Sequence, residues 1–402
     1  MLFWYLFSAV LVLGPIPAAR TPSSVAAKVP PPRADYVGDL ACQSCHEAQA
    51  KTYALTAHHL TTSWPSPRTL KGDFNSSGSV LRTTNPYLHF KMSSGPGGYF
   101  QSAIEEPGPG KSISRTERID IVAGEPRKGQ SYLFWKGDEL FQLPVTYWSE
   151  TDSWVNSPSY PDGSPHFDKV IIPRCLECHA SYFEWTPPPA NRYRKTSLVL
   201  GILCEKCHGP GREHVALHRV KTDLPGGTPE KIVNPSRLDR DRQLDVCGLC
   251  HAGNGIPFAP ALSFLPGNDL RDYIDLPVEG ASDAVDVHGN QVELLRQSRC
   301  FQLTKTLTCT TCHDVHKTQR NASAFSSVCL SCHQAQQCGE FSRVGKQIAD
   351  NCVDCHMPLQ ESKVLFVRAN GKTLHPQVRN HTIGIYGESK SSNLNSEKAG
   401  RP

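Results

Sequence analysis

Two hydrophobic patterns divide the chain. Between residues 64 and 165, apolar and polar positions alternate in short runs such as ERIDIVA and SYLFWKGDELFQLPVTYW, which is typical of half-buried strands. The second run is interrupted by Lys136, Gly137 and Asp138, a combination that favours a tight hairpin turn. The pattern predicts a small β-rich insertion, which we interpret as a surface elaboration in preference to a substrate domain.

Helical patterns lie on both sides of this insertion. Apolar residues with helical spacing predict short helices at 47–59, 212–222, 292–300 and 340–350. The chain contains 32 prolines and only 38% apolar residues, so a large regular core is not expected. The patterns predict a mainly α and irregular fold around the insertion. Residues 387–402 are polar and rich in Gly, Ser and Asn, which predicts a disordered tail.

The N-terminal segment is apolar from Leu2 to Leu13 and is followed by proline and small residues. This pattern is typical of a secretory signal peptide, which we place at residues 1–27. The run is short for a membrane span, although an uncleaved anchor that associates with a membrane is the alternative. We therefore expect the protein to be periplasmic or otherwise extracytoplasmic, in a bacterium.

The cysteines change this picture, because fourteen of the sixteen belong to seven C-x-x-C-H motifs. Two thiols followed by a histidine are typical of covalent haem c attachment, with the imidazole as an iron ligand. A structural zinc site that is built from cysteine pairs uses two of them. Seven pairs are an odd number, which argues against zinc binding. The motifs, numbered first to seventh, are Cys42/Cys45/His46, Cys175/Cys178/His179, Cys204/Cys207/His208, Cys247/Cys250/His251, Cys309/Cys312/His313, Cys329/Cys332/His333 and Cys352/Cys355/His356.

Seven covalently bound haems would supply the apolar surface that the chain lacks. The first motif lies in residues 28–63 and the other six lie in residues 166–386, too close together for separate domains. We therefore expect the chain to wrap around a haem stack. The formal charge of +4 becomes negative once each haem adds two propionates. With no basic run in addition, nucleic acid is not an expected partner.

Ten histidines lie outside the motifs and can supply second iron ligands. Methionine is scarce, and Met92 is the one free candidate, so most irons should be bound by two histidines, which favours low potentials. In TLTCTTCHDVH, His316 follows His313 by three residues. From that position, the imidazole of His316 reaches a neighbouring haem more naturally than the haem of its own motif. The alternative is that His316 is a solvated surface histidine.

The strings CEKCHGPGREH, TCTTCHDVH and CVDCHMP resemble the multihaem cytochrome c family. That family includes the tetrahaem cytochrome of nitrifying bacteria, pentahaem nitrite reductase and hydroxylamine oxidoreductase. The resemblance covers roughly residues 36–386 and extends to a heptahaem branch with a strand-rich insertion after the first haem. It implies second ligands at His58, His214, His288, His316 and His381, more weakly at His375, with His59, His89, His166 and His218 in reserve.

Cys300 and Cys338 lie outside every motif. In an exported protein, a remaining pair of cysteines favours a disulfide over two reactive thiols. Their separation in space is not contained in the sequence, so both alternatives stay open.

Three functions are compatible with these features. The favoured one is electron transfer between redox partner proteins whose identity the sequence does not give. The second is a reductase or oxidase for a small nitrogen or sulfur compound, and it requires one open haem. The motifs at Cys247 and Cys329 lack a nearby second histidine, so their irons are the best candidates for the open haem. The C-x-x-C-K motif typical of nitrite reductase is missing. The third is a haem-bearing subunit of a larger redox complex.

Overall fold

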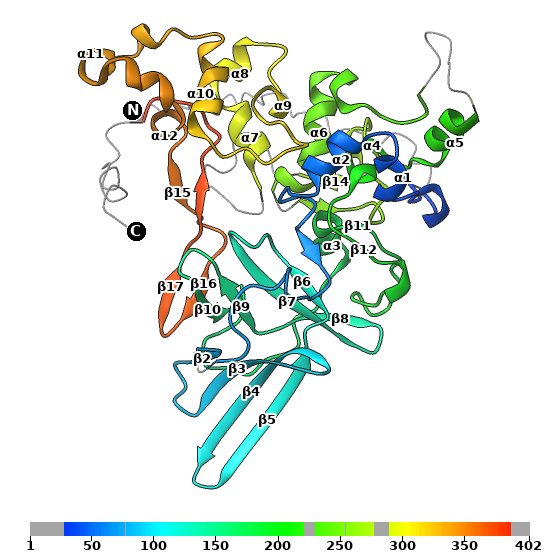
Figure 1. Cartoon of the computed structure of the whole chain (residues 1–402), viewed down its shortest axis with the longest axis vertical. Coiled ribbons are helices and arrows are strands. Elements are labelled where there is room, and N and C mark those ends of the chain that lie inside the picture. Colours follow the sequence, from blue (N-terminus) through cyan, green and yellow to red (C-terminus); the bar gives the residue numbers. More distant parts are fainter. Residues whose placement is uncertain (1–27, 77, 221–229, 254, 277–288, 387–402) are drawn as a thin grey trace, which may run out of the picture.

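The computed structural model describes residues 28–76, 78–220, 230–253, 255–276 and 289–386. The expected signal peptide, the expected tail and His288 lie outside these residues. Short helices occupy the upper half of the molecule in Figure 1 and the two large sheets occupy the lower half.

The helices are short, and glycine or extended residues end several of them. The predicted helix at 292–300 is divided by Ser298, which is extended, and the one at 340–350 is divided by Gly345 at φ +77°. The α-helices are α1 (Asp39–Gln43), α2 (Glu47–Tyr53), α3 (Pro173–His179), α4 (Cys204–His208), α5 (Arg212–Val220), α6 (Arg240–His251), α7 (Gln291–Arg296), α8 (Arg299–Leu303), α9 (Cys309–Cys312), α10 (Ala322–Leu330), α11 (Phe341–Val344) and α12 (Val353–His356). The 3-10 helices are η1 (Arg33–Asp35), η2 (Lys195–Ser197), η3 (Pro235–Arg237), η4 (Leu270–Asp272), η5 (Ala335–Gln337) and η6 (Gly345–Asp350).

A four-stranded antiparallel sheet forms the lower tip of the molecule. Its strands pair in chain order, and the β4–β5 hairpin projects farthest from the helices (Figure 1). The strand bounds are β2 (Val80–Arg82), β3 (Leu88–Gly95), β4 (Gly98–Gly108) and β5 (Lys111–Arg118).

An eight-stranded sheet lies between this tip and the helices. Its order is β1-β6-β7-β9-β10-β16-β17, with β8 paired to β7. The predicted hairpin at 136–138 is confirmed, since Lys136 pairs with Glu139 and Gly137 has a φ of +61°. The bounds are β1 (Thr62–Ser63), β6 (Ile121–Ala123), β7 (Gly129–Lys136), β8 (Glu139–Gln142), β9 (Val145–Trp148), β10 (Ser153–Asn156), β16 (Val367–Ala369) and β17 (Lys372–Leu374).

Three two-stranded sheets lie closer to the motifs. They pair β11 (Ala180–Tyr182) with β12 (Val199–Leu200), β13 (Ile256–Pro257) with β14 (Ile274–Asp275), and β15 (Leu359–Glu361) with β18 (Gln377–Arg379).

The fold is mixed α and β, with more strand than a mainly α and irregular chain with a small β-rich insertion would have. Strands form outside residues 64–165 as well: β16 and β17 extend the large sheet through the pairing of Asn156 with Arg368. The largest buried apolar cluster lies in the strand-rich part, around Phe90, Tyr132 and Trp154. The corresponding cluster between α6, α7 and α8 is smaller. Among the described residues, no helix combines the length and the hydrophobicity that crossing a bilayer requires.

Candidate haem-binding sites

Each motif lies within or next to a helix, at α1, α3, α4, α6, α9, α10 and α12. The amide N–H groups of His46, His313 and His333 each donate to the carbonyl oxygen of the first cysteine of their motif, at 2.9 Å. Residues i, i+3 and i+4 share one face of a helix, so the two thiols and the imidazole point to the same side. This arrangement places two sulfur atoms and one nitrogen atom where a haem edge and its iron need them.

The helices that carry the motifs pack against one another. Helix α1 packs on α4, α3 and α9 pack on α6, and α10 packs on both α9 and α12. At three of these junctions, thiols of two motifs lie close enough to shift each other's pKa: Cys42 with Cys204, Cys178 with Cys250, and Cys247 with Cys309.

The remaining motifs extend these contacts into one series. Cys207 of the third motif interacts electrostatically with Cys247 of the fourth. Cys329 of the sixth motif interacts in the same way with Cys312 of the fifth and Cys352 of the seventh. The series therefore runs from the first motif through the third, fourth, fifth, sixth and seventh, and the second branches from the fourth.

One cysteine in several motifs lies at the surface instead of in these junctions. Cys45 of the first motif is exposed, and its Sγ lies 3.9 Å from the hydroxyl oxygen of Ser44, whereas Cys42 of the same motif faces α4. Cys175, Cys332 and Cys355 are exposed as well. The role of Cys45 in haem attachment stays a prediction from its spacing.

Four motif histidines face a second histidine from elsewhere in the chain. Two imidazoles that bind one metal from opposite sides have ring centres about 6.2 Å apart, because each metal–nitrogen bond is about 2 Å long. The observed separations fit an iron between each pair. They are 6.4 Å for His46 and His214, 6.1 Å for His251 and His58, 6.1 Å for His208 and His316, and 6.3 Å for His313 and His381.

Hydrogen bonds at Nδ1 orient several of these rings. Nδ1 of His214 lies 2.7 Å from the carbonyl oxygen of Glu230, and Nδ1 of His208 lies 2.8 Å from that of Val233. A carbonyl oxygen only accepts, so Nδ1 carries the proton and Nε2 keeps the lone pair that binds iron. The same type of bond is made by His356 to Gly384, by His375 to Ser362 and by His381 to Arg379.

Burial keeps the candidate ligands neutral. It lowers the pKa of His58 and of His381 to about 4, and it also lowers the pKa values of His208, His251 and His313. His58 is exposed, and the neighbouring imidazoles of His251 and His313 add to the lowering of its pKa. Iron binds the neutral form of imidazole, so these shifts favour ligation at neutral pH.

The other candidates are placed differently. His375 contacts the ring of Phe366 and no motif histidine. Among the reserves, Nε2 of His59 lies 3.7 Å from the carboxylate of Asp39, and His218 bonds to the carboxylate of Glu230. His89 lies within β3, and exposed His166 lies beside Asp168. Met92 is fully buried in the strand-rich core, which removes it as an iron ligand.

The structure bears on two questions that the sequence left open. The chain after α2 places the ring of His58 6.1 Å from that of His251, so the fourth motif has a candidate second ligand. Cys300 and Cys338 are both free thiols in this structure. They lie near different motifs: Cys300 interacts with Cys312 and Cys329, and Cys338 interacts with Cys355.

Sequence reasoning also missed a buried carboxylate inside the third motif. Glu205 is 6% exposed, and its Oε1 accepts hydrogen bonds from the amides of Val37 and Gly211, at 2.9 and 2.8 Å. Its Oε2 accepts from the amide of Gly38 at 2.8 Å. These bonds fix the segment before the first motif to α4. The available signal was an acidic residue between the two cysteines, which also occurs at buried Glu177 of the second motif.

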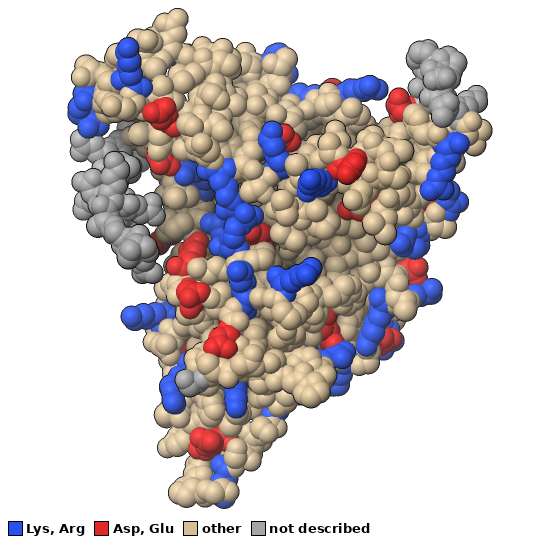
Figure 2. All heavy atoms as spheres, in the orientation of Figure 1, with Lys and Arg blue, Asp and Glu red and all other residues tan. Residues whose placement is uncertain are grey.

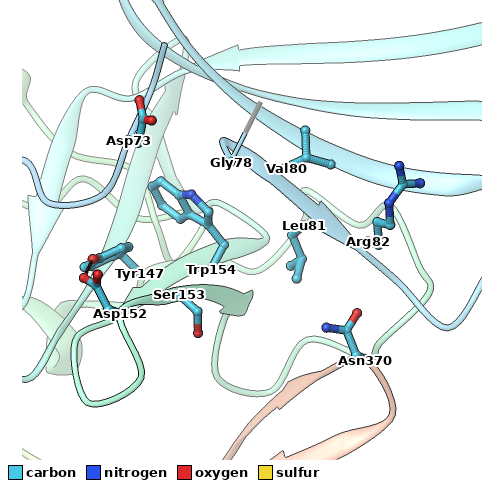
Figure 3. A pocket seen from close by; sticks show the side chains of 10 residues that line it. All are labelled: Asp73, Gly78, Val80, Leu81, Arg82, Tyr147, Asp152, Ser153, Trp154 and Asn370. Carbon is cyan, nitrogen blue, oxygen red and sulfur yellow. Dashed lines mark hydrogen bonds between the residues drawn. The ribbon is translucent and has the colours of Figure 1, made fainter. Parts of the chain in front are cut away.

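A cavity of about 540 Å³ lies away from the motifs, in the strand-rich part (Figure 3). The side chains of Asp73, Arg82, Trp154 and Asn370 line it, and they come from the segment before β2, from β2, from β10 and from the β16–β17 turn. None of its lining residues is a cysteine or a histidine. The cavity is therefore separate from the candidate haem sites.

Comparisons with known proteins agree with this reading of the motifs. The family model for cytochrome c554 and c-prime matches residues 132–209, which include the second and third motifs. No curated protein matches the chain. The crystal structure of the outer cell wall cytochrome OcwA has a similar fold, with a TM-score of 0.54 and 17% identity over 87% of this chain and 79% of that one.

A second solved structure is the undecahaem cytochrome from the S-layer of Carboxydothermus ferrireducens, with a TM-score of 0.39 and 16% identity over 82% of this chain and 52% of that one. The seven attachment motifs and the match of residues 132–209 to a haem protein family support a multihaem c-type cytochrome.

Proposed function

We propose that the protein is an extracytoplasmic heptahaem cytochrome that passes electrons through closely spaced haems, most of them bound by two histidines. One observation carries the proposal: the four imidazole pairs belong to motifs that contact one another in a continuous series. An electron carrier needs this continuity, because each step in the series joins adjacent redox groups.

The chain performs three tasks in this function. Its cysteines attach the haems, and its histidines hold the irons from both sides. The surrounding protein keeps the imidazoles neutral, in agreement with the lowered pKa values of His58 and His381. Each haem would supply an iron that alternates between the ferrous and the ferric state, which differ by one electron. Ligation by two histidines favours lower potentials than ligation by histidine and methionine.

Partners and location follow from the same proposal. We expect redox partner proteins as donor and acceptor, and no nucleic acid. Figure 2 shows basic and acidic side chains interspersed over one face, with a group of Lys and Arg near the junction of the helices and sheets. OcwA is an outer cell wall protein, and its similar fold supports a location outside the cytoplasm for this chain. The N-terminal segment would direct export or associate the protein with a membrane.

Two measurements on the haem-loaded protein test the proposal. Reductive titration should consume seven electrons per chain at low potential, and electrons should pass quickly to a soluble redox protein. Steady-state assays with reduced viologen and nitrite, hydroxylamine or tetrathionate should give slow turnover or none. Turnover of roughly ten per second or more on any of these compounds is ordinary enzyme activity and would assign the protein to the reductases instead.

A further inference from the structure

We propose that the iron of the sixth motif, held by Cys329, Cys332 and His333, has a sixth position open to a small external ligand. The inference rests on the proposed function, since it requires a haem at this motif. It adds a binding site to an electron carrier and specifies which of the seven haems provides it.

The ring of His333 differs from the four paired motif histidines. Those four have another imidazole at 6.1 to 6.4 Å. In the part of the chain that the structure describes, no ring contact joins another imidazole to His333. The nearest pairing in the series belongs to the fifth motif, where His313 faces His381 and also contacts the ring of Phe325 from α10.

The remaining candidate ligands belong to other motifs. His375 is fixed by its bond to Ser362, which directly follows β15, the strand that leaves the seventh motif after His356. The position of His375 therefore favours it as a ligand of the seventh haem. Gly289 packs on the fourth motif so closely that a Cβ atom there would lie 2.6 Å from the Cα atom of His251. Gly289 thus lies at the fourth motif, and His288 lies outside the described residues.

The reserve histidines are also held elsewhere. His218 bonds to Glu230 next to the first pair, and His59 lies beside Asp39. His89 and His166 belong to the strand-rich part. The described histidines therefore provide no sixth ligand for this iron.

The position of the sixth motif suits an external ligand. It contacts the fifth and the seventh motifs, so electrons can arrive from the series. Residues 331–334, which contain Cys332 and His333, are exposed and lie at the molecular surface. A five-coordinate ferrous haem binds small molecules that offer a lone pair and accept electron density. Carbon monoxide is the simplest probe of this class.

The test counts carbon monoxide bound to the reduced, haem-loaded protein. The wild type should bind it, and the C329A/C332A variant, which loses this haem, should bind one fewer per chain. The matched C352A/C355A variant, which loses the neighbouring haem, should keep the site. Binding that is undiminished in C329A/C332A would overturn the proposal.

Two further readouts keep the test decisive. In the oxidised wild type, a high-spin ferric signal should convert to low spin when imidazole is added. Absence of this conversion would overturn the proposal. This readout needs no variant, so it holds even if a variant fails to accumulate. A haem count by mass accompanies each measurement. Seven haems without carbon monoxide binding reject the open position alone, whereas a missing haem at Cys329 rejects the heptahaem function.

Discussion

The imidazole rings of His208 and His316 lie nearly parallel, at 16°, with their centres 6.1 Å apart. His208 ends α4, whereas His316 follows the fifth motif, so two distant segments meet at one candidate iron. The loop after His313 thereby serves the third motif instead of its own. Tyr53 also contacts His316, which fixes the ring from the side of α2.

Replacing His316 with alanine should convert one low-spin iron to high spin. The reason is that His208 alone would remain at the third haem, while the thioether bonds keep all seven haems attached. Electron paramagnetic resonance and near-infrared spectra measure the change. His166→Ala is the control, since that exposed histidine lies beside Asp168. Unchanged spectra for His316→Ala would show that His316 is a surface residue and not an iron ligand.

The exported, mature protein should carry seven covalent haems, because each motif presents two thiols and an imidazole on one face. A pyridine haemochrome assay combined with the protein mass gives the count. Five haems or fewer, in a host with intact maturation machinery, would contradict it.

Glu205→Gln should destabilise the protein by about 2 kcal/mol, because hydrogen bonds to a buried charged group are each worth about that much. The new amide group would point an N–H at the N–H of Gly38, which now donates to Oε2. Denaturant unfolding of the haem-loaded protein measures the loss. Glu213→Gln is the matched control, since Glu213 is exposed and lies 3.8 Å from Lys231. Equal stability of the two variants would show that the carboxylate does not hold the first motif.

Acid should disrupt the fold and the ligation together. Burial lowers the pKa of His58 and His381 to about 4, while histidine in an unfolded chain titrates near 6.5. Below about pH 6.5 the unfolded chain takes up protons that the folded chain excludes, so the free energy of unfolding decreases until about pH 4 and then levels off.

Two measurements check this pH dependence. The low-spin spectrum should be lost in acid, because protons compete with iron for the lone pair of each second histidine. Denaturant midpoints should decrease between about pH 6.5 and about pH 4. Midpoints that stay constant over this range would contradict protection of these two histidines by burial.

The sequence contained the attachment chemistry but not the pairing of ligands. A C-x-x-C-H motif acts within one helical turn, so local spacing specifies its geometry. The partner of His251 is His58, from a distant segment, and only packing brings the two together. The alternation at 129–142 specified the β7–β8 hairpin for the same local reason. The pairing of β16 with β10 joins Asn156 to Arg368 and could not be read from either strand alone.

The thiol contacts between motifs have a consequence for biogenesis. In the folded chain, Cys178 lies close to Cys250, and this proximity lowers the pKa of Cys178 to about 7. A thiol with a lowered pKa beside a second thiol is prone to oxidation in an export compartment. A disulfide between Cys178 and Cys250 would remove attachment points from two motifs at once. We therefore expect haem attachment to be most complete when it acts on a reduced chain before these two motifs pack together.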